Sequence, residues 1–519
     1  MTTKIKTYLI LAVIIILGIF LRVYHIDSAP PGVYPDEAVN GLDAIDAMHG
    51  QWQWFYPANN GREGLFMNLI ALCFKFFGIS VLTLKLPTII FGTLAIWGIY
   101  LLGAELFRNR AVGLFGAFLT AVSFWSINFS RISFRANMTP ALLAFSFYFL
   151  FRGMRTRKWY DFALGGLVFG LGLHTYIAFR IAPLILIVML FALIISRENF
   201  LKNYWRAIVT FIFFAFISAS PMLYTFFVAH PEYWQSRTSE ISILNPAVNQ
   251  GHLLSAFGKT FGLALAKYNF WGDQNWRQNY PPYAILDPLT GIAFLFGFIY
   301  AIIKIFHLLY VRFRRKIRDE KLEVYVFLVA GFLIMLLPEI MGEEGNPHAL
   351  RSIGTMPFVF VFAALTFNYF WGQAQSKTYI HKKIVTGIIL VMLFSIGLFN
   401  PLKYFVFWAN NPKTAEAFEA NLADAQKYIA TLPAGEEIFF VSGNMQRVPL
   451  RLFNSKNPNF QELHPTDLDT IRPKDPKNFT VIFTDYQKDE IVSNLTSRFP
   501  DLQLEERTDK AGMKFYILK

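Results

Sequence analysis

The chain has 519 residues, of which 54% are hydrophobic and 16% are charged, and its mean hydropathy is +0.38. This composition excludes an ordinary soluble enzyme and is typical of a protein that crosses a membrane several times. The net charge of +13 does not indicate nucleic-acid binding, because Lys and Arg occur in short clusters between apolar stretches, as in cytoplasmic loops. The single cysteine, Cys73, leaves no intramolecular disulfide and no thiolate metal site.

Apolar stretches of about 20 residues, each long enough to cross a bilayer, predict about eleven transmembrane helices. The first follows Lys4 and Lys6, but no small-residue cleavage pattern comes after it, so we expect a retained helix rather than a signal peptide. Residues 64–77 are apolar but short and interrupted by Lys75, which predicts an interfacial helix. The eleven stretches begin near Tyr8, Leu82, Ala111, Thr139, Asp161, Ile181, Ala207, Leu289, Leu322, Ser352 and Ile384.

The basic clusters predict the orientation of these helices. With the N-terminus in the cytoplasm, every cluster falls on the cytoplasmic side, as the positive-inside rule requires. Counting residues 64–77 as a span would place the later clusters outside. We therefore expect a multi-pass plasma-membrane protein with a cytoplasmic N-terminus. The loops expected on the external side are 24–81, 130–138, 174–180, 229–288 and 339–351.

After residue 400 the sequence becomes more polar and its apolar runs shorten. We expect two domains: a transmembrane domain over residues 1–400 and a periplasmic or extracellular α/β domain over residues 401–519, which is long enough to hold its own core. The periodicity of this second part predicts helices over 414–432 and 487–499 and strands over 437–442, 478–484 and 513–518.

A pair of carboxylates, Asp36 and Glu37, follows the first span in the sequence Pro-Pro-Gly-Val-Tyr-Pro-Asp-Glu-Ala. One interpretation is helix capping, because Asp is a preferred N-cap and acidic residues stabilise a helix N-terminus. The other is general base chemistry, in which one carboxylate takes a proton from an acceptor hydroxyl while its neighbour binds a metal or orients the site. The two are compatible, since a capping residue can lie at the mouth of a pocket.

Cationic residues on the expected external side are candidates for binding phosphate. Arg131 and Arg135 share one helical face, and we favour substrate phosphate over lipid headgroups as their partner, because a guanidinium binds phosphate oxygens in a fork. Two further arginines occur in later external loops. The phosphate candidates are Arg131, Arg135, Arg180 and Arg351, and the further candidates near them are His174, Tyr176 and His348.

The long loop over residues 229–288 is rich in Trp and Tyr. Trp271, with Asp273, Gln274, Asn275 and Arg277, could stack on sugar rings and bind their hydroxyls, but a membrane-interface belt explains the aromatic residues equally well. A loop of this length is often a functional lid.

Several motifs are absent from the sequence. It contains no P-loop, no Gly-x-Gly-x-x-Gly fingerprint and no His-Glu-x-x-His motif. No set of spans carries ionisable residues at mid-helix, which disfavours a transporter or flippase.

The order and placement of five motifs resemble the GT-C membrane glycosyltransferases, in the protein O-mannosyltransferase-like branch that includes aminoarabinose transferases and Rgt-type bacterial sugar transferases. The resemblance covers most of residues 1–370. Its motifs are Pro30 to Ala38, Gly61 to Phe66, Lys85 to Pro87, Phe129 to Arg135 and His348 to Gly354.

This resemblance implies a GT-C fold and an inverting transfer of sugar from a polyprenyl-phosphate donor to a lipid, glycan or protein hydroxyl at the outer face of the membrane. It implies Asp36 as the base, with Glu37 beside it, and a divalent metal ion that Glu63 could bind. The family's Lys-Pro-Pro after this Glu is replaced here by Gly-Leu-Phe, and the second external loop has no acidic residue. A ligase or polymerase that uses a polyprenyl-diphosphate carrier is an alternative within the same class.

Overall fold

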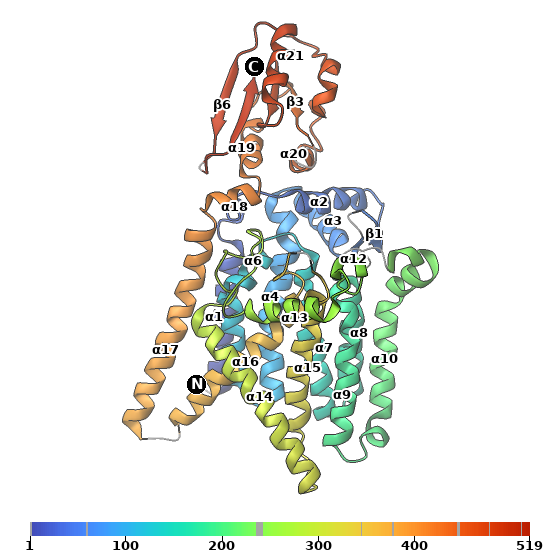
Figure 1. Ribbon diagram of the computed structural model, residues 1–519, viewed down its shortest axis with the longest axis vertical. Coiled ribbons are helices and arrows are strands. Elements are labelled where there is room, and N and C mark those ends of the chain that lie inside the picture. The colour runs from blue at the N-terminus through green and yellow to red at the C-terminus, as the bar shows by residue number, and fades with distance from the viewer. Residues whose placement is uncertain are drawn as a thin grey trace.

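A computed structural model describes residues 3–58, 61–234, 242–343, 345–375, 378–443, 447–476, 478–509 and 511–519. A bundle of long helices makes up most of the molecule, and a small domain built on a β-sheet stands on one end of it (Figure 1). Residues 235–241, which belong to the long loop predicted over 229–288, lie outside the described residues.

Each predicted apolar stretch begins within or next to a helix of the bundle. These helices are α1 (Thr3–Val23), α4 (Val81–Phe107), α5 (Arg110–Val122) with α6 (Phe124–Ser130), α7 (Met138–Thr156), α8 (Trp159–Leu171), α9 (Pro183–Ser196), α10 (Phe200–Tyr224), α14 (Pro288–Arg314), α15 (Lys321–Ile340), α16 (Met356–Gln375) and α17 (Tyr379–Leu402).

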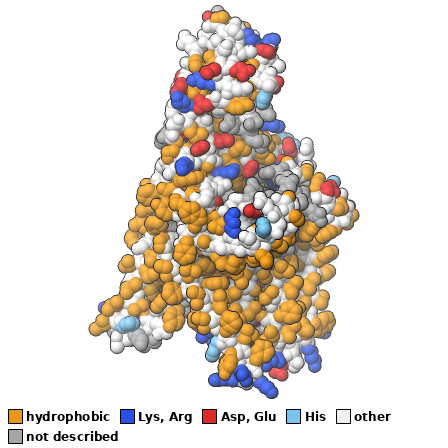
Figure 2. Space-filling model, viewed as in Figure 1, with side chains coloured by type: hydrophobic (Ala, Val, Ile, Leu, Met, Phe, Trp, Pro, Cys, Tyr) orange, Lys and Arg blue, Asp and Glu red, His pale blue; other side chains and the backbone are white. Residues whose placement is uncertain are grey.

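Within the described ranges, eight helical segments are long and apolar enough to cross a membrane, or nine if α5 and α6, bent by 61°, form one broken span. The other two predicted spans, α7 and α8, are helical but fall short of this measure. Helix α8 has 13 residues, and α7 carries Arg152 and Arg155 near its end. Figure 2 shows a broad hydrophobic band across the visible face of the bundle, with charged side chains gathered at its two ends. Such a band is expected of a surface that faces lipid.

Small residues allow some of these helices to approach closely. A Cβ atom on Gly166 would lie 2.2 Å from the carbonyl oxygen of Phe211, and one on Gly170 would lie 2.1 Å from that of Ala215. The two glycines are four residues apart on α8, which is the small-xxx-small spacing that lets membrane helices pack backbone against backbone.

Two short helices, α2 (Pro35–Met48) and α3 (Leu65–Phe77), lie across the end of the bundle next to the small domain (Figure 1). Helix α3 corresponds to the predicted interfacial helix and has 13 residues, too few to span a bilayer. Strands β1 (Phe55–Tyr56) and β2 (Arg62–Glu63) pair antiparallel between them.

Other short helical segments connect these elements. They are η1 (Arg135–Asn137), η2 (Gly172–His174), η3 (Ile177–Ile181), the π-helix η4 (Thr225–Ala229), η5 (Pro231–Trp234), α12 (Pro246–Asn249), α13 (Leu253–Ala266), η6 (Ile353–Thr355), and the π-helix η7 (Lys403–Trp408), which continues α17.

The small domain contains a five-stranded sheet in the order β4-β3-β5-β7-β6. Strand β3 pairs parallel with β4 and β5, whereas β7 pairs antiparallel with β5 and β6. Strands β3, β5 and β7 match the three predicted strands, while β4 and β6 were not predicted. The strands are β3 (Glu437–Val441), β4 (Phe460–Leu463), β5 (Phe479–Phe483), β6 (Leu504–Thr508) and β7 (Lys514–Leu518).

Four α-helices and η9 (Pro465–Thr470) accompany this sheet: α18 (Pro412–Ala417), α19 (Ala420–Ile429), α20 (Arg447–Phe453) and α21 (Lys488–Arg498). The predicted helix over 414–432 is thus divided into α18 and α19, and α20 was not predicted. Helix α20 packs on α2, where a Cβ on Gly41 would lie 2.7 Å from a methyl group of Leu452. The small domain therefore rests on the helix whose first turn carries the Asp36–Glu37 pair.

Candidate active site

A cavity of about 880 Å³ lies beside α2 and is lined mainly by polar and charged side chains. Six segments that are far apart in the sequence contribute to it, and all belong to loops that were predicted to share one side of the membrane. Its lining residues are Asp36, Val39, Asn40, Ala58, Arg62, Phe134, Arg135, Ala136, Tyr176, Asp273, Gln274, Asn275, Arg277, Gln278, Gly345, Asn346, His348, Leu350 and Arg351.

Asp36 lies in the first turn of α2 and is half-buried at the cavity. The N-cap of the helix is Tyr34 rather than Asp36, and Pro35 occupies the first helical position. Proline is favoured there because its fixed φ suits a helix and its missing N–H would have no partner. The helix dipole stabilises negative charge in the first turn of a helix. Asp36 is therefore a carboxylate that faces the cavity without serving as the helix cap.

Glu37 is placed differently from its neighbour. Its side chain is completely buried, and Oε2 accepts a hydrogen bond from the backbone N–H of Ser133 at 2.7 Å. Burial raises the pKa of Glu37, while the positive charge of the nearby Lys85 opposes that effect. Glu37 thus holds the loop that carries Arg135 and does not line the cavity.

Arg135 is held in the cavity wall by Glu63. Its Nε donates to Oε2 of Glu63 at 2.7 Å, and its guanidinium lies 5.6 Å from the ring centroid of Tyr176. The second carboxylate oxygen of Glu63 is 3.9 Å from Arg180. Because Glu63 lies between two arginines, its charge is already compensated.

Arg62 is a lining residue that the sequence reasoning did not identify. Its guanidinium makes an ion pair of 2.6 Å with Asp43 and donates to Oδ1 of Asn40 at 2.9 Å. Asn40 in turn donates to the carbonyl oxygen of Ser133. In the sequence, Arg62 is distinguished only by its position beside Glu63 in the Gly-Arg-Glu motif. Its partners Asn40 and Asp43 belong to no motif, so the sequence gives no sign that they would hold it.

Residues 273–278 of the long loop line the cavity and are hydrogen-bonded to the segment that follows His348. Oδ2 of Asp273 accepts a hydrogen bond from the backbone N–H of Ala349 at 2.7 Å, and the side chain of Gln278 accepts one from Leu350. Burial raises the pKa of Asp273 to about 7. This carboxylate therefore changes charge near neutral pH inside the cavity wall.

Arg277 connects the cavity to the start of the small domain. Its guanidinium lies 4.9 Å from the ring centroid of Tyr34. Burial raises the pKa of Glu419 to about 7, and the positive charge of Arg277 opposes that effect. Glu419 immediately precedes α19 of the small domain, so its carboxylate lies within electrostatic range of Arg277 in the cavity wall.

Comparison with known proteins adds to this geometry. Residues 65–224 match the family model described as dolichyl-phosphate-mannose-protein mannosyltransferase. No curated protein matches the sequence. Among solved structures, the oligosaccharyltransferase AglB from Archaeoglobus fulgidus, in complex with an inhibitory peptide and a dolichol-phosphate, is similar with a TM-score of 0.53 and 11% identity, covering 99% of this chain and 74% of that one.

ArnT from Cupriavidus metallidurans is similar along nearly its whole length. In the apo state the TM-score is 0.52 at 11% identity, covering 100% of this chain and 98% of that one. Bound to undecaprenyl phosphate, the TM-score is 0.50 at 12% identity, covering 99% and 98%. The chain has the GT-C membrane fold. The resemblance and fold class predicted from the sequence are thereby confirmed.

In this GT-C chain the cavity brings together five of the predicted site residues. Asp36, Arg135 and Tyr176 come from the first three predicted external loops, and the other two residues come from the last one. The five are Asp36, Arg135, Tyr176, His348 and Arg351.

The remaining predicted phosphate ligands of the GT-C chain have other partners. Arg131 is fully buried and donates to the backbone carbonyls of Leu21, Tyr24 and Ala29 at 2.6–3.0 Å, so it fixes the end of α1. Arg180 donates to the carbonyl of Trp234 at 2.7 Å and is packed against aromatic rings. Both arginines hold segments around the cavity and do not line it.

Two other candidates also lie away from the cavity. His174 is buried with Nε2 2.8 Å from the carbonyl oxygen of Ser218, and burial lowers its pKa. Trp271 lines a separate, mostly apolar cavity of about 770 Å³, together with Tyr283 and Lys403.

The predicted metal site at Glu63 does not fit the residues around it. Its carboxylate faces Arg135 and Arg180. Among the residues that the structure describes, no group of three or more His, Cys, Asp or Glu side chains is placed to hold a metal ion.

Proposed function

We propose that the chain is a membrane glycosyltransferase that moves a sugar from a polyprenyl-phosphate donor to a hydroxyl acceptor, with Asp36 as the general base. The observation that carries this proposal is the cavity in which the Asp36 carboxylate and several arginines meet. The family model, which is described by a dolichyl-phosphate-mannose reaction, supports the same class of donor. So does the similarity to ArnT, a structure of which contains undecaprenyl phosphate.

The proposed reaction needs a base and an anion site on opposite sides of the sugar. The acceptor hydroxyl oxygen forms a bond to the anomeric carbon as the bond from that carbon to the phosphate oxygen breaks, which inverts the configuration. The hydroxyl proton passes to Asp36, and polyprenyl phosphate leaves with the bonding electrons. A positioned carboxylate contributes by accepting the proton as the new bond forms.

Arginines in the cavity wall would stabilise the negative charge that develops on the leaving phosphate. Arg135 and Arg351 were predicted for this role, and Arg62 and Arg277 lie in the same wall. Fixed positive groups lower the barrier most when they are held in place before the reaction. Glu63 and Asp43 hold Arg135 and Arg62 in this way.

The amide side chains of the cavity suit a neutral sugar. Asn40, Gln274, Asn275, Gln278 and Asn346 offer donors and acceptors for hydroxyl groups without adding charge. We place the reaction on the external side of the membrane, because every lining segment belongs to a loop opposite the basic clusters.

The test compares purified wild-type protein with Asp36→Asn on a panel of polyprenyl-phosphate sugars and measures release of polyprenyl phosphate. We expect the substitution to lower the rate by about 10²- to 10⁴-fold, the usual contribution of a general base. Asp46→Asn is the matched control, because Asp46 is exposed on the same helix and does not line the cavity.

Equal rates for wild type and Asp36→Asn would remove Asp36 as the base. Release from diphosphate carriers alone would replace the proposed donor with that of a glycan ligase or polymerase. No release from any carrier, with the protein folded, would contradict the proposal of a transferase.

A further inference from the structure

A second polar cavity lies at the opposite end of the helix bundle and takes no part in the proposed reaction. Its volume is about 700 Å³, and it is formed by the ends of α4, α14, α15 and α16 with the loops beside them. It lies at the end that carries the basic clusters, which the positive-inside rule assigns to the cytoplasm. Its charged lining residues are Glu105, Arg108, Arg197, Lys304, Arg318, Asp319, Glu320, Lys321 and Glu323, with His307 among them.

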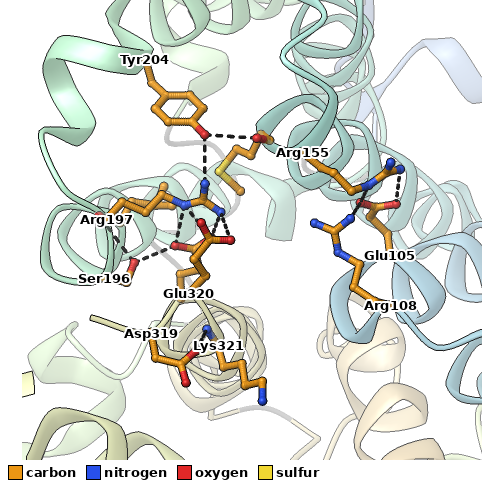
Figure 3. A network of polar contacts seen from close by, with 12 residues as sticks. Glu105, Arg108, Arg155, Ser196, Arg197, Tyr204, Asp319, Glu320 and Lys321 are labelled. Carbon is orange, nitrogen blue, oxygen red and sulfur yellow. Dashed lines mark hydrogen bonds and ion pairs between the residues drawn. The ribbon is translucent and has the colours of Figure 1, made fainter. Parts of the chain in front are cut away.

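The acidic side chains of this cavity already have partners (Figure 3). Glu105 receives two hydrogen bonds from Arg155, at 2.6 and 2.9 Å. Glu323 pairs with Arg197 at 2.6 Å and also accepts a hydrogen bond from Ser196. These pairs connect different helices and give the cavity a fixed wall.

The two remaining acidic side chains, Glu320 and Asp319, also have partners. Glu320 lies 3.1 Å from the same Arg197 guanidinium. Oδ1 of Asp319 accepts the backbone N–H of Lys321 at the start of α15. Each acidic side chain of the wall therefore has a partner inside the protein, with Glu320 and Glu323 sharing the guanidinium of Arg197.

Two lysines are not committed in this way. Within the described part of the chain, neither Lys304 nor Lys321 makes an ion pair, and Lys304 only lies over the ring of Tyr300, 5.3 Å from its centroid. Lys304 is half-buried and Lys321 is exposed, and both line the cavity. The cavity thus presents two ammonium groups without an ion-pair partner beside acidic side chains that already have partners.

The surroundings place these ammonium groups at the depth of lipid headgroups. On α14, Ile303 and Phe306 are 60% and 69% exposed, as expected of residues that face lipid chains. The neighbouring rings of Tyr300 and Tyr369, with centroids 6.3 Å apart, are typical of a membrane interface. Basic pockets between transmembrane helices on the cytoplasmic side bind phospholipid headgroups.

We infer that this cavity is a binding site for a phosphate group, in which Lys304 and Lys321 supply the charge. The lipid-facing residues beside it favour the headgroup of an anionic phospholipid as the source of that phosphate. A soluble phosphate would meet the same two ammonium groups. The inference is independent of the proposed transferase activity, because none of these residues lines the cavity of Asp36.

The test uses purified full-length protein in detergent micelles and native mass spectrometry to count bound lipid. The wild type should retain phosphatidylglycerol in preference to phosphatidylcholine. Lys304→Gln with Lys321→Gln should lower that preference roughly 10- to 30-fold, since each cation near an anionic headgroup contributes to binding. Lys304→Arg with Lys321→Arg keeps both charges and should keep the preference.

A matched control separates this site from diffuse surface charge. Lys202→Gln with Arg206→Gln removes the same charge from exposed positions near the start of α10, outside the cavity. It should bind phosphatidylglycerol like the wild type. Equal losses in the two double glutamine variants would overturn the inference.

A competition experiment with inorganic phosphate distinguishes a phospholipid headgroup from a soluble phosphate as the ligand. Displacement of phosphatidylglycerol by inorganic phosphate, in the wild type and not in the glutamine variant, would assign the site to a soluble phosphate. Retention of the lipid in excess inorganic phosphate would assign it to the headgroup. Absence of both lipid preference and phosphate binding in the wild type would overturn the inference.

Discussion

Adjacent carboxylates in the first turn of α2 have different surroundings, and this difference decides which of them can do chemistry. Asp36 is half-buried at the cavity, whereas Glu37 is buried against the backbone of Ser133. Consecutive residues of a helix point about 100° apart, so the sequence identified the pair but not which member faces the cavity. That choice depends on how α2 packs on the bundle.

Arginine residues show the same limit of sequence reasoning. The topology placed the predicted arginines on one side of the membrane, but only Arg135 and Arg351 line the cavity. Arg131 is bound to backbone carbonyls more than 100 residues away in the chain. A contact across that distance follows from helix packing and leaves no local signal.

Asp273 provides a pH-dependent prediction. Its pKa of about 7 lies above the usual Asp value of about 3.9, so between these values the folded state holds a proton that the unfolded state has lost. The free energy of unfolding should therefore fall as the pH rises from about 4 to 7, by at most about 4 kcal/mol. Asp273→Asn should lose this part of the pH dependence and gain stability relative to the wild type above pH 7.

Thermal unfolding of both proteins in the same detergent between about pH 5 and 8 measures this difference. Glu419 has a pKa raised in the same direction, so Glu419→Gln serves as a control that removes a different contribution. A wild-type curve and an Asp273→Asn curve that run parallel across this range would contradict the prediction.

At the scale of whole elements, the apolar stretches predicted the helices well because lipid requires long apolar segments with all backbone groups bonded internally. The elements that were not predicted are short or exposed. All five residues of β6 are exposed, so its sequence has no buried alternation, and β4 is only partly buried. Helix α20 has seven residues, fewer than two full periods of burial pattern.

The contact between α8 and α10 supports a prediction about packing. A Cβ on Gly170 would lie 2.1 Å from both the carbonyl oxygen of Ala215 and the hydroxyl of Ser218. Gly170→Ala must push the two helices apart, and overpacking of this kind costs about 1–3 kcal/mol. The thermal unfolding temperature of the purified protein should fall accordingly.

Gly372→Ala in α16 is the control, because no atom lies within 4 Å of the added Cβ. Alanine also has the higher helix propensity, so this control should unfold at or slightly above the wild-type temperature. Similar decreases for the two variants would show that close approach of α8 and α10 is not the cause.

At the scale of the whole molecule, the small domain and the cavity share the helix that carries Asp36. Helix α20 packs on one face of α2, and Asp36 faces the cavity from the first turn of the same helix. Leu452 of α20 is fully buried against Gly41 and belongs to a cluster with Ala38, Ala44 and Phe66. The domain therefore supports α2 from the side away from the membrane.

Leu452→Ala tests this support. It leaves a cavity beneath α20 and should destabilise the contact by about 2–5 kcal/mol, the range for buried Leu→Ala changes. We expect faster proteolysis of the connection around residues 409–412 and a lower rate of polyprenyl-phosphate release, because α2 loses the contact that fixes it. Proteolysis reports on domain contact whether or not the proposed reaction is correct.

Leu504→Ala, at a position 44% exposed on β6, removes the same atoms from the far edge of the sheet and should leave both readouts unchanged. Unchanged proteolysis in Leu452→Ala would mean that the domain is held by other contacts and that α2 does not depend on α20.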